Sequence, residues 1–65
     1  MFNDALLEYE MKIRKISKDD MCSALGMSRS AFYRKRLGKS QWTYDDMQKI
    51  KKLLGRDVAI RIFLP

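Results

Sequence analysis

The most informative segment of this chain is MSRSAFYRKRL at residues 27–37, followed by Gly38-Lys39. It predicts one short helix over 29–37, because Ser28 is a good N-cap and Gly38 suits the left-handed position after the last turn. At about 100° per residue, Phe32 points one way and most polar residues fan out on the opposite side. Only Phe32 and Ala31 are expected to face inward, which is too little apolar surface to hold the helix by burial alone.

Five cations crowd this helix and its C-terminal end, with no acid among them: Arg29, Arg34, Lys35, Arg36 and Lys39. Like charges within two turns destabilise a helix unless an anion lies nearby. We therefore expect Phe32 to anchor the helix, while the cations face phosphates and base edges. The formal net charge of +6 also favours a polyanionic partner, either nucleic acid or an anionic membrane surface.

Length and composition exclude several classes of protein. The 65 residues predict a single small domain over 1–65, too small for an enclosed active site. With one cysteine, Cys22, and no histidine, neither a disulfide framework nor a structural zinc site is expected, and a reducing cytoplasm is the natural compartment. No apolar run approaches the roughly 20 residues that span a bilayer, so no membrane-spanning segment is expected. A membrane surface is also not the expected partner, because the cations lie on a motif whose geometry fits the groove of B-form DNA.

Enzyme activity is not expected either. The carboxylate pairs Asp19-Asp20 and Asp45-Asp46 fall in first turns of predicted helices, where acids are favourable, and adjacent side chains diverge around a helix. No nucleophile has a base at a suitable spacing. We therefore expect no catalytic residue, no metal, no cofactor and no small-molecule substrate.

Two helices are predicted before the central segment. The first spans 4–15, is capped by Asn3 and buries one stripe whose members recur at three and four: Phe2, Ala5, Leu6, Tyr9, Ile13 and Ile16. The second spans 18–25, because Ser17 and Asp20 have near capping-box spacing and Gly26 suits its end. Its predicted inner face consists of Met21, Cys22 and Leu25.

A further helix is predicted over 44–54, after the cap residue Thr43 and before Gly55. Its expected inward residues are Tyr44, Met47, Ile50 and Leu54. The final segment, 57–65, fits two structures. Asp57 as N-cap favours a short helix, whereas alternating apolar residues from Val58 onward fit a strand, and we favour the helix.

The C-terminal segment carries more apolar surface than so small a core can absorb. Four residues make up this excess: Ile60, Ile62, Phe63 and Leu64. An apolar patch of this kind on a small domain is typical of a protein interface. We expect a second copy of the chain to cover it, which predicts a homodimer.

Only Gly26-Met27-Ser28 separates the helices predicted over 18–25 and 29–37, a connection typical of a helix-turn-helix. The run Leu25-Gly26-Met27-Ser28-Arg29-Ser30, then Phe32 and Gly38-Lys39, with Ile16-Ser17 upstream, resembles the Cro/cI-type (Xre) family of phage repressors and related regulators. The resemblance covers about residues 6–54. It implies a lambda-repressor-like all-α bundle of about five short helices, dimeric on operators of two-fold symmetry. The sequence departs from the family pattern at Arg36 and Leu37, and at Cys22, where the family favours alanine.

By position in the motif, the resemblance implies which residues contact DNA. Base contacts fall to Arg29, Ser30, Tyr33 and Arg34, and phosphate contacts to Ser17, Lys18, Ser28, Lys35 and Lys39. Arg29 and Arg34 are the best suited to base recognition, because a guanidinium makes a bidentate pair with O6 and N7 of guanine. Leu37 either packs inward or meets thymine methyl groups.

The expected function is sequence-specific binding of double-stranded DNA by a transcriptional regulator of the bacterial cytoplasm. A phage or prophage repressor or Cro-like protein, acting as a homodimer on a palindromic operator, fits best. The alternative is an antitoxin or protein-interaction module on the same fold, whose basic helix docks on an acidic partner, because fold does not fix function.

Overall fold

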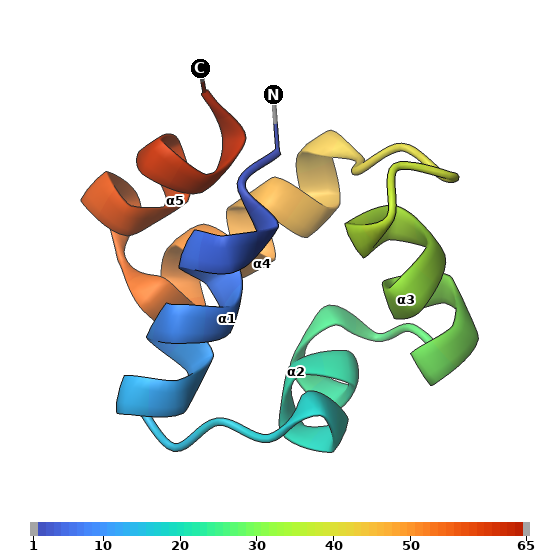
Figure 1. Ribbon diagram of the computed structural model, residues 1–65, viewed down its shortest axis with the longest axis horizontal. Coiled ribbons are helices and arrows are strands. Elements are labelled where there is room, and N and C mark those ends of the chain that lie inside the picture. The colour runs from blue at the N-terminus through green and yellow to red at the C-terminus, as the bar shows by residue number, and fades with distance from the viewer. Residues whose placement is uncertain (1, 65) are drawn as a thin grey trace.

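A computed structural model describes residues 2–64 and shows five α-helices with no strand among these residues (Figure 1). The helices are α1 (Asp4–Ile13), α2 (Lys18–Leu25), α3 (Arg29–Arg36), α4 (Tyr44–Leu54) and α5 (Arg56–Phe63). The predicted all-α class is therefore confirmed, and the strand alternative for the C-terminal segment is wrong. The last helix begins at Arg56 with Gly55 as its N-cap, earlier than the predicted start at Asp57.

Side-chain caps fix the starts of α2, α3 and α4, as predicted. At the start of α2, the hydroxyl oxygen of Ser17 accepts the backbone N–H of Asp20, and the Asp20 carboxylate accepts the backbone N–H of Ser17. At the start of α4, Thr43 and Asp46 form the same reciprocal pair of hydrogen bonds. Each of these capping boxes satisfies two backbone donors at a helix start. Ser28 Oγ likewise accepts a backbone N–H of α3 at 3.1 Å.

The connection between α2 and α3 is the predicted three-residue turn. Gly26 has φ 67°, a left-handed conformation that other residues adopt at a cost, and its N–H donates back to carbonyls of α2. α3 ends at Arg36, one residue earlier than predicted, and Gly38 follows with φ 79°. These local features orient α3 relative to α2.

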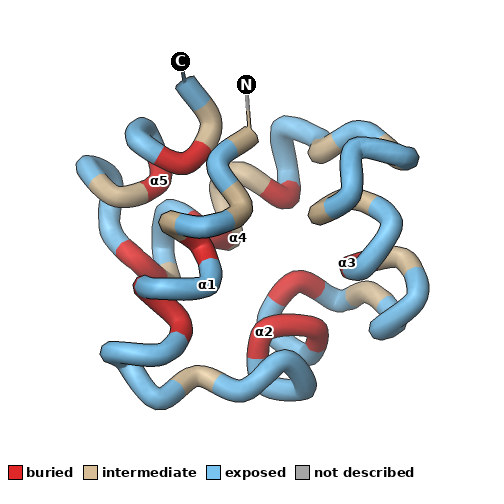
Figure 2. The backbone as a smooth tube through the Cα atoms, in the orientation of Figure 1, coloured by how far each residue is buried: buried red, intermediate tan, exposed pale blue. Residues whose placement is uncertain are grey.

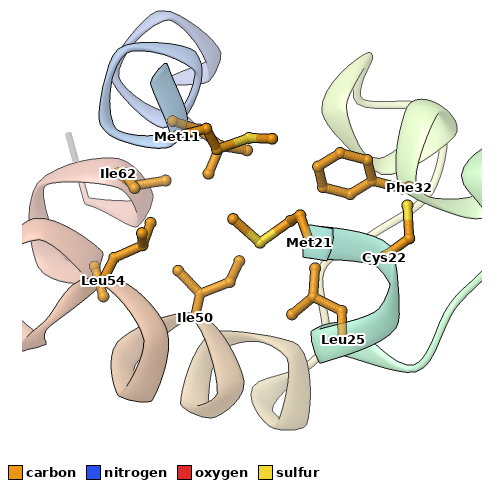
Figure 3. Close-up of a cluster of buried hydrophobic side chains, with 10 residues drawn as sticks. Met11, Met21, Cys22, Leu25, Phe32, Ile50, Leu54 and Ile62 are labelled. Carbon is orange, nitrogen blue, oxygen red and sulfur yellow. The ribbon is translucent and has the colours of Figure 1, made fainter. Parts of the chain in front are cut away.

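All five helices contribute to one core, whose buried segments face one another (Figures 2 and 3). Its members are Leu7, Met11, Met21, Cys22, Leu25, Phe32, Ile50, Leu54, Ala59 and Ile62. The inner face predicted for α2 is confirmed in full. In α4, Ile50 and Leu54 are buried, but Tyr44 is 77% exposed, so its predicted orientation is wrong. At about 100° per residue, Tyr44 lies about 120° around the helix from Ile50.

The stripe predicted for α1 is right only in part: Phe2, Leu6 and Ile16 pack against the core, whereas Ala5, Tyr9 and Ile13 are exposed. Tyr9 and Ile13 are more than half exposed, and the helix instead buries Leu7 and Met11, which lie on the opposite side of the helix. Glu10 is buried beside them and accepts a hydrogen bond from Arg14 Nε at 3.0 Å. An acid on the inner side is tolerated because this ion pair keeps its charge compensated. The helix also ends at Ile13, two residues before the predicted end.

The C-terminal helix packs against the start of the chain. The backbone N–H of Asn3 donates to the carbonyl of Ile62 at 2.7 Å, and the Phe63 ring lies 5.6 Å from those of Phe2 and Trp42. Ile62 is fully buried, so its predicted place in a dimer interface is wrong. The reason is helical periodicity, which turns Ala59 and Ile62 into the core and leaves other apolar residues of α5 outside.

No helix within residues 2–64 has both the length and the apolar character needed to cross a membrane.

Candidate nucleic-acid interface

α3 has two contrasting faces, and exposed stretches alternate along it with less exposed ones (Figure 2). The outward face consists of exposed residues only: Arg29, Ser30, Tyr33, Arg34 and, just after the helix, Leu37. The residues on the other side are Ala31, Phe32, Lys35 and Arg36. At about 100° per residue the two sets occupy separate arcs. Leu37 is 52% exposed, so it does not pack inward.

Phe32 connects α3 to the core. Its side chain is 3% exposed, and its ring meets Trp42 edge-on with 6.1 Å between ring centroids. Figure 3 shows the ring pointing from α3 into the cluster that contains Met11 and Met21. The predicted anchoring role of Phe32 agrees with this burial.

Arg36 also faces inward, contrary to the expectation that all the cations of this helix point outward. Its Nε donates to Oδ1 of Asp4 at 2.6 Å, and its Nη2 donates to Asp4 and to Glu8. The guanidinium lies 5.4 Å from the Phe32 ring centroid, and 12% of the side chain is exposed. The hydrogen bond with Asp4 is the largest reason that the Arg36 pKa is raised, with burial opposing it and Glu8 adding to it.

Lys35 is the second cation that the structure turns inward. Its amine forms an ion pair with the buried carboxylate of Asp46 in α4 and lies 5.9 Å from the Trp42 ring centroid. Only 16% of the Lys35 side chain is exposed. The amine of Lys35 therefore makes an internal contact in place of the predicted phosphate contact, and Lys35 is not part of the outward face of α3. Asp46 is separated from Lys35 by 11 positions, so no helical spacing in the sequence indicated this ion pair.

The other residues predicted to contact phosphate are exposed: Ser17, Lys18, Ser28 and Lys39. Ser17 and Ser28 use their hydroxyl oxygens as caps, but the O–H of each can still donate to a phosphate oxygen. Lys18 lines an open hollow of about 440 Å³ together with four residues of the outward face: Arg29, Ser30, Tyr33 and Leu37. Neither Lys18 nor Lys39 has an acidic partner in the described part of the chain.

Arg29 and Asp19 form a charged contact on this surface that the sequence pattern did not indicate. Nε of Arg29 lies 3.4 Å from Oδ1 of Asp19, which belongs to the first turn of α2. The two side chains are 68% and 74% exposed. Both residues lie at N-terminal ends of helices that are adjacent in sequence, but only the packing of α2 on α3 brings them together.

Cys22 lies beneath this surface and is buried. Burial is the largest cause that raises the pKa of its thiol, and Asp19 acts in the same direction, while Arg29 lowers it. A thiol with a raised pKa is protonated at neutral pH and is a poor nucleophile. Within residues 2–64, no group of three or more His, Cys, Asp or Glu side chains is arranged to hold a metal ion.

The structure thus gathers Lys18 and the outward face of α3 on one side of the molecule, and holds that face in place through Phe32, Lys35 and Arg36. The α2–α3 pair supplies most of the predicted contact residues. In comparisons with known proteins, no family model, no curated protein and no solved structure matches the chain.

Proposed function

We propose that the protein binds double-stranded DNA in a sequence-dependent manner, with the outward face of α3 in the major groove. The observation that carries this proposal is the division of α3 into an exposed polar face and a face fastened by Phe32, Lys35 and Arg36. Such fastening keeps the outward side chains on a rigid element, which precise recognition requires. An α-helix with its side chains is about 10–12 Å across, which fits a major groove about 12 Å wide.

The exposed residue types fit the two kinds of contact that DNA offers. Arg29 and Arg34 carry guanidinium forks for guanine, and Leu37 offers an apolar surface for thymine methyl groups. Lys18 and Lys39 flank this face and are suited to phosphates, which fix register and orientation. The arginine guanidinium groups lie on the outward face and the lysine amines lie at its flanks. This arrangement supports sequence-dependent binding over purely electrostatic binding.

The arrangement of α2 and α3 supports a regulatory role. Two short helices joined by Gly26-Met27-Ser28 form the type of unit that Cro/cI-type repressors use, and the resemblance of the sequence to that family points the same way. We therefore propose a transcriptional regulator of the phage or prophage repressor type, which acts by occupying an operator and excluding polymerase.

The proposal includes a homodimer joined through α5. Ile60 and Leu64 are 43% and 57% exposed and line, with Met47 and Phe63, an open hollow of about 280 Å³ between α4 and α5. Figure 1 places α5 and α3 at opposite ends of the longest axis, which measures 26 Å. Two copies joined through α5 are therefore long enough to hold two α3 helices about 34 Å apart, one turn of DNA.

Ile60→Asp is expected to convert the dimer to monomers, because it places a charge in the centre of the apolar patch. Sedimentation at micromolar concentrations measures the change. Ile13→Asp is the matched control, since Ile13 is 55% exposed on α1, and it should leave the dimer intact. A charge at Phe63 would also disturb the rings of Phe2 and Trp42, so Ile60 is the cleaner position. An unchanged sedimentation coefficient for Ile60→Asp would exclude this interface.

Selection of bound sequences from random duplexes tests the function itself. We expect one preferred site with two-fold symmetry, bound about 10³-fold or more tightly than random duplex, and an affinity that falls steeply with salt. A salt dependence without a preferred site would indicate non-specific binding. If the protein shows neither a preferred site nor a salt dependence, and captures an acidic protein that added DNA does not displace, the protein-interaction alternative is favoured.

Arg34→Ala and Lys39→Ala are expected to weaken DNA binding in different ways. Loss of the Arg34 fork should cost about 1–3 kcal/mol on the preferred site and relax the preference at one base pair of each half-site. Loss of the Lys39 amine should weaken all duplexes alike and lower the salt slope by about one. Titrations on preferred and random duplexes separate the two effects, and equal losses for both variants would contradict the assignment.

A further inference from the structure

Arg29 is the one residue of the outward face of α3 that has an ion-pair partner within the described chain. Its Nε lies 3.4 Å from Oδ1 of Asp19, and both side chains are largely exposed. An exposed ion pair of this kind contributes little to folding stability, because water screens it and both side chains lose freedom in forming it. The pair therefore calls for an explanation other than stability.

Asp19 is an unfavourable residue on a surface that binds phosphates. Its neighbour Lys18 and its partner Arg29 both line the hollow beside the outward face, where a carboxylate repels a polyanion. Asp19 does suit the N-terminal dipole of α2, but Asp20 is the acid that closes the capping box there. The dipole accounts for an acid in this turn and leaves the contact with Arg29 unexplained.

The backbones of the two residues are held in a fixed relation. The capping box of Ser17 fixes the start of α2, and the Ser28 cap fixes the start of α3. Gly26 closes α2 between them, and Phe32 anchors α3 in the core. The Asp19 carboxylate is thus presented to Arg29 by two capped helices and not by a flexible loop.

We propose that Asp19 is a positioning residue, which orients the guanidinium of Arg29 toward a guanine base. This inference rests on the proposed function. Asp19 contacts the Nε side of the guanidinium, which leaves the two terminal amino groups for O6 and N7 of guanine. An arginine that such a contact biases toward one orientation loses less conformational freedom when it docks. The ligand is a guanine–cytosine pair in the major groove opposite Arg29.

Asp19→Asn tests the inference, because asparagine keeps the size of the side chain and removes its charge. Arg29→Ala first identifies the base pair whose recognition depends on Arg29. At that base pair, Asp19→Asn is expected to lower discrimination for guanine about three-fold and to leave the other positions unchanged. Asp57→Asn is the matched control: Asp57 is exposed in the first turn of α5, and its loss should change no base preference.

A double-mutant cycle separates positioning from a general charge effect. In the Arg29→Ala background, Asp19→Asn should cause no further loss of discrimination, because a positioning residue acts only through the group that it orients. A loss that persists there, a loss spread over all positions, or no loss at all would overturn the role of Asp19 with the proposed function intact. The proposed role of Asp19 is also overturned if Arg29→Ala changes no base preference. A wild-type chain without a preferred duplex overturns the proposed function itself.

Discussion

Phe32→Ala is expected to destabilise the fold by about 3–5 kcal/mol, the largest effect of any single substitution on α3. Phe32 is 3% exposed, and its loss leaves a cavity that Trp42 and Arg36 now border. A domain of this size has about 3–10 kcal/mol of stability in total, so the variant should be largely unfolded or barely stable at 25 °C. Urea unfolding followed by circular dichroism measures the change.

Tyr33→Ala is the control for this prediction, since it removes a neighbouring aromatic ring from the same helix. Tyr33 is 63% exposed, so its loss should change the free energy of unfolding by no more than about 0.5 kcal/mol. DNA affinity, by contrast, should fall for Tyr33→Ala. If the two variants are equally stable, the ion pairs of Lys35 and Arg36 hold α3 in place and the Phe32 ring does not.

Helix boundaries were the most predictable part of the fold, because the signals that set them lie within a few residues of each other. Ser17 and Asp20 form their capping box without help from any other element, and Gly26 takes its left-handed conformation for the same local reason. The start of α5 was less predictable. Gly55 both closes α4 and is the N-cap of α5, so the prediction that Asp57 is the N-cap is wrong.

Which side of a helix is buried was less predictable where apolar residues occur all around it. In α1, Tyr9 and Ile13 have helical spacing, as do Leu7 and Met11, and periodicity cannot choose between the two pairs. Tertiary packing buries the second pair, Leu7 and Met11. In α5 the same ambiguity placed Ile62 in the predicted interface, although it is in the core.

The candidate site shows the same limit in its charges. The outward face was predictable because the Ser28 cap and Phe32 define the register of α3. The inward cations were not, because Arg36 finds its acids 28 and 32 positions away in α1. A count of cations along one helix therefore overstated the number available to DNA.

Asp46→Ala is expected to destabilise the protein by about 2–4 kcal/mol. The carboxylate of Asp46 accepts the backbone N–H of Thr43 at 3.0 Å and pairs with the amine of Lys35. Its loss removes the acceptor of the Thr43 N–H, one half of the capping box of α4, and leaves the largely buried Lys35 amine without its partner. Asp45→Ala is the control in the same turn: its side chain is 75% exposed and pairs with Lys49 at the surface, so we expect a loss below about 0.5 kcal/mol.

The contribution of Asp46 is also expected to depend on pH. Burial alone would raise the pKa of this carboxyl, but the hydrogen bonds from Lys35 and Thr43 together outweigh burial and lower the pKa below its ordinary value of 3.8. A group whose pKa is lowered by folding stabilises the fold above its unfolded pKa, and this stabilisation is lost as pH falls through the folded pKa. The wild-type free energy of unfolding should therefore decline below about pH 4.

Asp46→Asn separates this decline from that of the other carboxylates. The variant should be less stable than wild type at pH 7, and the two free energies of unfolding should converge as the pH falls below 4, because wild-type Asp46 then also becomes neutral. Asp45→Asn is the control in the same turn and should change the free energy of unfolding at pH 7 by less than about 0.5 kcal/mol. Urea titrations between pH 2 and pH 7 provide the comparison. A difference in the free energy of unfolding between Asp46→Asn and wild type that stays constant with pH would contradict this prediction. It would mean that the cap geometry holds α4 against α3, and that the charge paired with Lys35 does not.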